Sequence, residues 1–156
     1  MEQLSTGNKK VVVFKIENEE YATGIGQVER ILEFEKITRI PDAPDFLKGV
    51  INYQGRIIPV IDLKIRFNLS VTSINESSKI IIAKHDDGDV GLIIDDVSQV
   101  ISIEDDKLCP SPDIISGIVR EYIKGIIKLE KRIIIYLDLG KILSFTERKY
   151  VAQMIN

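Results

Sequence analysis

Tryptophan is absent from this chain, and histidine and cysteine occur once each. The single cysteine, Cys109, excludes an internal disulfide framework and is typical of a reducing compartment. No stretch approaches the roughly 18 consecutive apolar residues of a membrane-spanning helix. Residues 1–8 also lack the apolar segment of a secretory signal. These absences predict a cytoplasmic protein without a membrane segment.

The chain also lacks an excess of positive charge. Its 24 acidic and 21 basic residues give a net charge of −3 and a pI of about 5.3. A nucleic-acid surface needs clustered lysine and arginine to displace counterions. The five Phe and five Tyr residues are scattered rather than interleaved with basic ones. Nucleic-acid binding by a pair of small barrels is therefore a disfavoured alternative.

Side chains arranged for catalysis or metal binding are equally scarce. His85 lies at the edge of a polar turn, and no Gly-x-Ser-x-Gly motif marks a nucleophile. The turn at residues 86–89 lacks the spacing of a calcium loop, and one histidine with one cysteine cannot form a structural zinc site. We therefore expect no catalytic residue, no metal and no cofactor. A small hydrolase using His85 or Cys109, or another barrel-type binding module, is the alternative.

What the chain does have is an internal repeat. Residues 48–63 read KGVINYQGRIIPVIDL and residues 124–139 read KGIIKLEKRIIIYLDL, with eight identities at an offset of 76. Residues 11–28 match residues 80–97 at an offset of 69, so the second copy has a longer internal connection. A unit of about 65 residues is marginally stable alone. We therefore expect the two halves to share a buried seam.

Short β-branched runs separated by turn signals predict a mostly β fold. The expected strands are Val11–Ile16, Tyr21–Thr23, Val28–Phe34, Thr38–Ile40, Leu47–Tyr53, Arg56–Ile61, Lys79–Lys84, Val90–Ile94, Val97–Ile103, Ile118–Leu129 and Arg132–Leu137. Asp62 and Asp138 are expected to cap short helices, and residues 146–156 to form a terminal helix. About five short strands per half indicate two small five-stranded barrels side by side.

Positions that the two copies share are interpreted as structural. These pairs are Gly49/Gly125, Arg56/Arg132 and Asp62/Asp138. The glycines would give backbone clearance, and the arginines a local bond or surface charge. The copies differ most at the tip of the predicted hairpin, where residues 52–55 stand against residues 128–131. Because loops both vary freely and carry function, this difference indicates either a binding site or neutral drift.

One long motif carries a family resemblance. Its residues are Thr38, Arg39, Ile40, Pro41, Pro44, Phe46, Gly49, Val50, Ile51, Asn52, Gly55, Ile57, Pro59, Val60, Asp62 and Leu63. The match continues through residues 90–97 and 122–139 and covers about residues 10–145. The sequence resembles the CheW family of coupling proteins in bacterial chemotaxis.

The resemblance implies two Src-homology-3-like barrels related by a pseudo-two-fold axis. One domain would span residues 10–156, with subdomains at 10–69 and 78–145, a first strand that crosses the seam, and a flexible leader at 1–9. It also implies a non-catalytic scaffold that couples the cytoplasmic tip of transmembrane chemoreceptors to the regulatory domain of the chemotaxis histidine kinase. Such a scaffold would be recruited to receptor arrays at the inner face of the membrane. The kinase-binding face is not identified.

By position, the resemblance implies two sets of site residues. The expected receptor-binding residues are Val12, Ile25, Val28, Ile31, Gln54 and Gly55. The expected coupling-motif residues are Gly49, Asn52, Arg56, Gly91 and Gly125. Relatives usually carry arginine at the position of Gln54 and often an acid at that of Arg30. The spacing of Ile25, Val28 and Ile31 also suits an apolar patch that accepts one face of a helix, although each could instead belong to the core.

Overall fold

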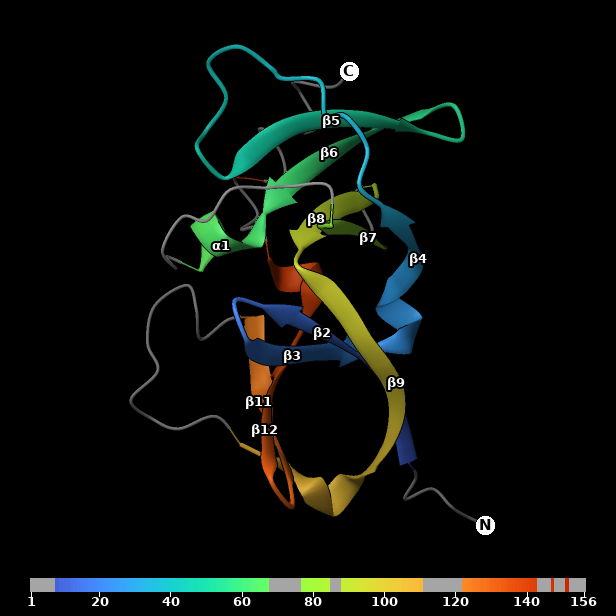
Figure 1. The fold of residues 1–156 in the computed structure, drawn as a ribbon, viewed down its shortest axis with the longest axis vertical. Coiled ribbons are helices and arrows are strands. Elements are labelled where there is room, and N and C mark those ends of the chain that lie inside the picture. Colours follow the sequence, from blue (N-terminus) through green and yellow to red (C-terminus); the bar gives the residue numbers. More distant parts are fainter. Residues whose placement is uncertain are drawn as a thin grey trace.

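The computed structural model describes residues 8–67, 77–84, 88–110 and 122–142, together with Glu147 and Val151. These residues form two β-sheets, one above the other in Figure 1, with only short helical segments between the strands. The mostly β fold predicted from the repeat is confirmed. The two sheets differ in size, because the lower one has six strands where five were expected.

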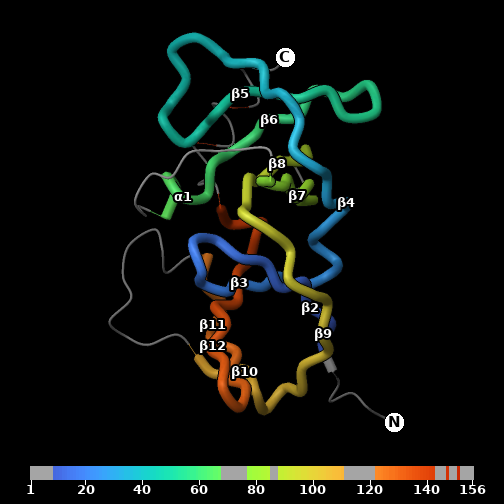
Figure 2. Tube along the Cα trace, viewed as in Figure 1, coloured from blue at the N-terminus to red at the C-terminus, as the bar shows by residue number. Residues whose placement is uncertain are grey.

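The lower sheet has the strand order β10-β11-β12-β3-β2-β9. Its strands are β2 (Asn8–Ile16), β3 (Glu19–Gly24), β9 (Asp96–Glu104), β10 (Leu108–Cys109), β11 (Ile123–Leu129) and β12 (Arg132–Leu137). The edge strand β9 leads through the 3-10 helix η2 (Asp105–Lys107) into β10 at the opposite edge. Figure 2 shows this connection at the lower end of the trace. The chain thus joins the two edges and curls the sheet into a barrel, and the two-residue β10 is its additional strand.

The upper sheet has the strand order β4-β7-β8-β6-β5. Its strands are β4 (Val28–Glu33), β5 (Leu47–Tyr53), β6 (Arg56–Asp62), β7 (Lys79–Ala83) and β8 (Val90–Ile94). Thr38, between the edge strands β4 and β5, exchanges two backbone hydrogen bonds with Val50, of 2.9 and 2.8 Å. The strand expected at residues 38–40 is therefore reduced to one bridge, which closes the upper barrel as β10 closes the lower one.

Each sheet contains strands from both copies of the repeat. The hairpin β2–β3 pairs with β12 in the lower sheet, and the hairpin β7–β8 pairs with β6 in the upper sheet. Both contacts are parallel, and their registers correspond: Tyr136 lies opposite Ala22, as Val60 lies opposite Gly91. The two copies have therefore exchanged their first hairpins. The subdomain ranges 10–69 and 78–145 stay a prediction. Strands β2 and β3 belong to the first range by sequence, but they pair with β9 and β12 of the second range.

Three apolar clusters fill this arrangement. One lies inside the lower barrel and includes Val11, Ile127 and Ile134, and a second lies inside the upper barrel at the equivalent positions, including Ile80, Ile51 and Ile58. The largest joins the two sheets, and its buried members include Phe14, Ile61, Leu92 and Leu137. Burial of apolar surface stabilises by about 25 cal/mol per Å². The largest cluster is therefore the shared seam that the repeat predicts.

Local sequence signals are mostly confirmed at the helix starts. The Asp62 carboxylate accepts a hydrogen bond of 2.9 Å from the Lys64 N–H and caps α1 (Leu63–Arg66). Asp138 accepts one of 3.0 Å from Gly140 and caps the 3-10 helix η3 (Leu139–Lys141). A third 3-10 helix, η1 (Ile25–Gln27), links β3 to β4.

Several predicted boundaries differ from the structure or lie beyond it. Strand β2 begins at Asn8, inside the stretch 1–9 expected to be a leader, and residues 1–7 lie outside the described residues. Strand β11 begins at Ile123 rather than Ile118, and residues 118–121 are not described. Of the expected terminal helix 146–156, only Glu147 and Val151 are described, and both are helical.

Candidate functional site

An apolar patch lies where η1 and β4 meet. Ile25 in η1 is 45% exposed, and Val28 and Ile31 on β4 are half-buried with one side against the shared cluster. The three residues are therefore not enclosed within a barrel. Figure 1 shows η1 and β4 at the same side of the molecule as β9. We call Ile25, Val28 and Ile31 the η1 patch.

Val100 is an exposed aliphatic residue that the sequence interpretation missed. It lies on β9 directly opposite Val12 of β2, and its exposed fraction is 53%. Val12 is only 2% exposed, so it presents almost no surface. The repeat contained a usable signal, because Val100 corresponds to Ile31 at the offset of 69. The structure thus places Val12 beside Val100, and it places η1 at the start of β4.

The tip of the β5–β6 hairpin has a left-handed turn. Gln54 and Gly55 have φ of 51° and 81°, which is the pattern of a type I′ turn. The Asn52 carboxamide oxygen accepts a hydrogen bond of 3.0 Å from the Gly55 N–H, and all three residues are exposed. In the β11–β12 hairpin, neither Glu130 nor Lys131 has a positive φ. The two tips therefore differ in backbone shape as well as in sequence.

Arg56, at the base of the first tip, is held by its own neighbours. Its guanidinium donates to Glu29 and Asp89 at 2.8 and 2.9 Å and lies over the Tyr53 ring, 5.5 Å from the centroid. The hydrogen bond to Asp89, followed by that to Glu29, raises the pKa of Arg56. The expected local bond is confirmed.

Arg132 makes the corresponding contact in the lower barrel. It binds both carboxylate oxygens of Glu20, at 2.9 and 2.8 Å, and this hydrogen bonding holds the pKa of Glu20 below its ordinary value. Glu20 corresponds to Asp89 at the offset of 69. Each arginine therefore pairs with an acid of the other copy, as the exchanged hairpins require.

The glycines of the expected coupling motif sit at tight backbone contacts. A Cβ at Gly49, where φ is 151°, would overlap the Thr38 carbonyl and lie 2.8 Å from the Ile37 side chain. A Cβ at Gly125 would lie 2.5 Å from the Cys109 carbonyl oxygen. Both sites are where the barrel edges meet, so the predicted backbone clearance is confirmed.

Gly91 lies in the strand contact between the two copies. An added Cβ would lie 3.2 Å from Ile80 and 3.3 Å from Val60, which is tighter than ordinary contact. Its equivalent in the first copy, Ala22, carries a Cβ at the same register. Gly91 is therefore explained by packing in the upper barrel.

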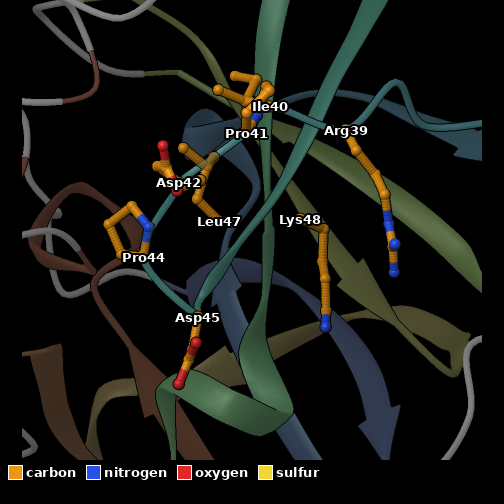
Figure 3. A pocket seen from close by; sticks show the side chains of 9 residues that line it. Arg39, Ile40, Pro41, Asp42, Pro44, Asp45, Leu47 and Lys48 are labelled. Carbon is orange, nitrogen blue, oxygen red and sulfur yellow. The ribbon is translucent and has the colours of Figure 1, made fainter.

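A shallow pocket of about 360 Å³ lies in the loop that leads into β5. In Figure 3 the Arg39, Lys48 and Asp45 side chains extend toward the bottom of the view, and Asp42 points toward the top. The lining also includes Leu47 and mixes both signs of charge with apolar side chains. No opposed pair of carboxylates, and no nucleophile with a base, lines this pocket.

The alternative of a small hydrolase finds no support in the described part of the chain. Cys109 is half-buried on β10, and His85 lies outside the described residues. Within residues 8–67, 77–84, 88–110 and 122–142, no three His, Cys, Asp or Glu side chains are grouped to hold a metal. No helix among these residues has the length and apolarity to cross a membrane.

Comparison with known proteins gives a consistent result. A model of the CheW-like domain family matches residues 10–147. The chain is 34% identical over 146 residues to the chemotaxis protein CheW of Klebsiella aerogenes, covering 94% of this chain and 88% of the relative. It is 33% identical over 141 residues to that of Bacillus subtilis, covering 90% of each.

A solved structure agrees with these relatives. The crystal structure of the scaffolding protein TtCheW from Thermoanaerobacter tengcongensis matches with a TM-score of 0.81 at 36% identity. The match covers 90% of this chain and 95% of that one.

Proposed function

The chain belongs to the CheW-like domain family, the scaffold proteins of bacterial chemotaxis, and we propose that it couples chemoreceptors to the chemotaxis histidine kinase without catalysing a reaction. In this proposal it binds the cytoplasmic tip of the receptors and the regulatory domain of the kinase. It joins receptor arrays at the inner face of the membrane through the receptors rather than through a segment of its own.

The exposed apolar surface of the η1 patch carries the proposal. Ile25 is 45% exposed and lies in the chain just before Val28 and Ile31, and an apolar surface that several residues share, unlike a single exposed aliphatic, marks an interaction site. Val28 and Ile31, half-buried against the shared cluster, extend the same surface. An amphipathic helix binds by placing such a row of apolar side chains against another. Val12 is only 2% exposed on β2, so in this proposal it supports the fold around the patch rather than contacting the receptor.

The hairpin tip is the second surface in the proposal. Gln54 and Gly55 project from the fold in a turn that no other part of the described chain covers. Asn52 and Arg56 hold this turn, through the hydrogen bond to Gly55 and the ion pairs to Glu29 and Asp89. We assign Asn52 and Arg56 to shaping the tip, and Gln54 and Gly55 to contact with a partner.

Co-sedimentation with chemoreceptor-containing membranes tests the receptor role. We expect Ile25→Glu to weaken binding by roughly tenfold or more, because it places a charge in an apolar contact. Val28→Glu should also weaken receptor binding. Ile133→Glu is the matched control, since Ile133 is 67% exposed on β12, away from the patch. Equal binding of Ile25→Glu and Ile133→Glu would contradict the assignment of the patch.

The kinase role needs a separate measurement. Pull-down with the regulatory domain of the kinase should succeed for the wild type and for Ile25→Glu alike, because the two partners bind different surfaces in this proposal. A wild-type protein that binds neither receptor membranes nor the kinase would remove the coupling function altogether.

A further inference from the structure

The helix η1 cannot hold its own position. It is a 3-10 helix of three residues whose N-cap, Gly24, makes no side-chain capping bond. The hydrogen-bond geometry of a 3-10 helix is poorer than that of an α-helix, so a three-residue segment gains little stability from its own hydrogen bonds. At Gly26 an added Cβ would meet nothing within 4 Å, so no neighbour packs closely there. The position of Ile25 must therefore be set from elsewhere.

The Gln27 side chain supplies the missing contacts. Its Oε1 accepts a hydrogen bond of 2.7 Å from the Thr23 hydroxyl and one of 3.0 Å from the Leu139 N–H. Its Nε2 donates to Asp138 Oδ1 at 2.7 Å. The Gln27 carbonyl oxygen accepts from the Lys84 N–H at 2.9 Å. One residue thus connects η1 to β3, to η3 and to the end of β7.

We propose that Gln27 is the positioning residue of the η1 patch, a role that rests on the receptor-binding function proposed above. Gln27 lies between Ile25 and Val28, so its hydrogen bonds fix the spacing and direction of both side chains. Two of its partners, Asp138 and Leu139, follow the last strand of the second copy. A receptor surface on the first copy is therefore held in place by the second.

The other half of the molecule makes this connection differently. There Asp95 stands at the place of Gly26, forms an ion pair of 2.8 Å with Lys64, and accepts a hydrogen bond of 2.7 Å from the Glu17 N–H. The equivalent of Ile25 is Ile94, which is fully buried. The neutral amide of Gln27 thus occurs in the half where the neighbouring aliphatic side chain is exposed.

An isosteric exchange tests the proposal. Gln27→Glu replaces the donor Nε2 with an acceptor and sets a second carboxylate against Asp138, so the contact becomes repulsive. Adding Asp138→Asn removes the charge repulsion and lets the new amide Nδ2 donate to the carboxylate at position 27. The recovery should be incomplete, because the atom that faces residue 27 also accepts from the Gly140 N–H, and a nitrogen there cannot. Asp138→Asn alone keeps an acceptor for Gln27, so amide exchange in η1 and receptor binding should change little. Gln99→Glu is the matched control for added charge, since Gln99 lies beside Arg132.

Amide hydrogen exchange reports on η1 without any partner. In Gln27→Glu we expect the Lys84, Leu139 and Val28 amides to exchange at least tenfold faster, and in the double variant to return to within about threefold of wild type. Unchanged exchange at these amides in Gln27→Glu would overturn the proposal, whatever the receptor result.

Receptor co-sedimentation then measures the consequence. We expect Gln27→Glu to weaken binding about tenfold, with recovery in the double variant, while kinase pull-down and the unfolding midpoint change little. Wild-type affinity in Gln27→Glu, or no recovery in the double variant, would overturn the positioning role. Absence of binding by the wild type itself would instead remove the receptor function, and hydrogen exchange would still decide whether Gln27 holds η1.

Discussion

The β5–β6 and β11–β12 hairpins have equivalent bases and unlike tips. At the bases, Gly49 and Gly125 clear the carbonyls of Thr38 and Cys109, and both hairpins end in a capping aspartate. At the tips, the first hairpin has a left-handed turn with Gln54 and the second has none. Closing a barrel limits the base sterically, whereas the tip is free to change. The difference therefore separates what the fold requires from what a partner can select.

Substitution of the two base glycines should have the largest effect. We expect Gly49→Ala to destabilise by roughly 3 kcal/mol or more, because the methyl group overlaps a backbone carbonyl at an unfavourable φ. Gly125→Ala should cost about 2 kcal/mol, since only the steric contact applies. Denaturant unfolding measures both. A cost below about 0.5 kcal/mol at either site would show that the two glycines correspond in sequence but not in their effect on stability.

The two arginine contacts should differ in strength. Among the described carboxylates Arg132 pairs with Glu20, whereas Arg56 has both Asp89 and Glu29. Glu20→Gln should therefore cost about 1 kcal/mol, and Asp89→Asn less, because Glu29 still holds Arg56. Unfolding free energies from chemical denaturation compare the two variants. Equal losses would mean that Glu29 contributes nothing to holding Arg56.

The Glu20 contact should also depend on pH. The folded pKa of Glu20 is lowered from the ordinary value of 4.5, so its contribution is complete above that pH and is lost as the pH falls through the lower folded pKa. Unfolding measured at pH 7 and near pH 3 should show a smaller difference in Glu20→Gln than in wild type. An identical pH dependence in the two proteins would exclude Glu20 as a contributor.

Alanine substitution in each turn tests whether the two tips contribute differently to the free energy of unfolding. Gly55→Ala should cost about 1 kcal/mol because φ is 81°, although nothing lies near the added methyl group. Lys131→Ala should change stability by less than about 0.5 kcal/mol, since its φ is not positive. Thermal unfolding of the two variants distinguishes them. A neutral Gly55→Ala would mean that the left-handed turn relaxes without loss.

The smallest effect is expected at the seam. Tyr122 corresponds to Phe46 at the offset of 76, and its buried hydroxyl has no hydrogen-bond partner among the described residues. Tyr122→Phe removes a desolvated polar group, so it should be neutral or stabilising by up to about 1 kcal/mol. Calorimetry checks the sign. A clear destabilisation would show that an ordered water or another group satisfies this hydroxyl.

Local features were predictable wherever one residue determines them. Asp62 and Asp138 were identified as caps from their type and place, and the glycine pairs from their identity in both copies. The exchange of hairpins was not predictable, because periodicity identifies a strand but not its neighbour. The contacts of Gln27 were missed for a related reason, since its partner Asp138 is 111 residues away.

The exchanged hairpins also constrain how the protein is made. The upper barrel includes β8, so it cannot be complete before residue 94 has left the ribosome, and the lower barrel waits for residue 137 in β12. Until then β2 and β3 lack one or both of their partners β9 and β12, although they precede every other strand that the structure describes. Unpaired strand edges promote association between chains. The exchange of hairpins holds the two copies together in the folded protein. It therefore also lengthens the time for which the β2–β3 hairpin remains unpaired during synthesis.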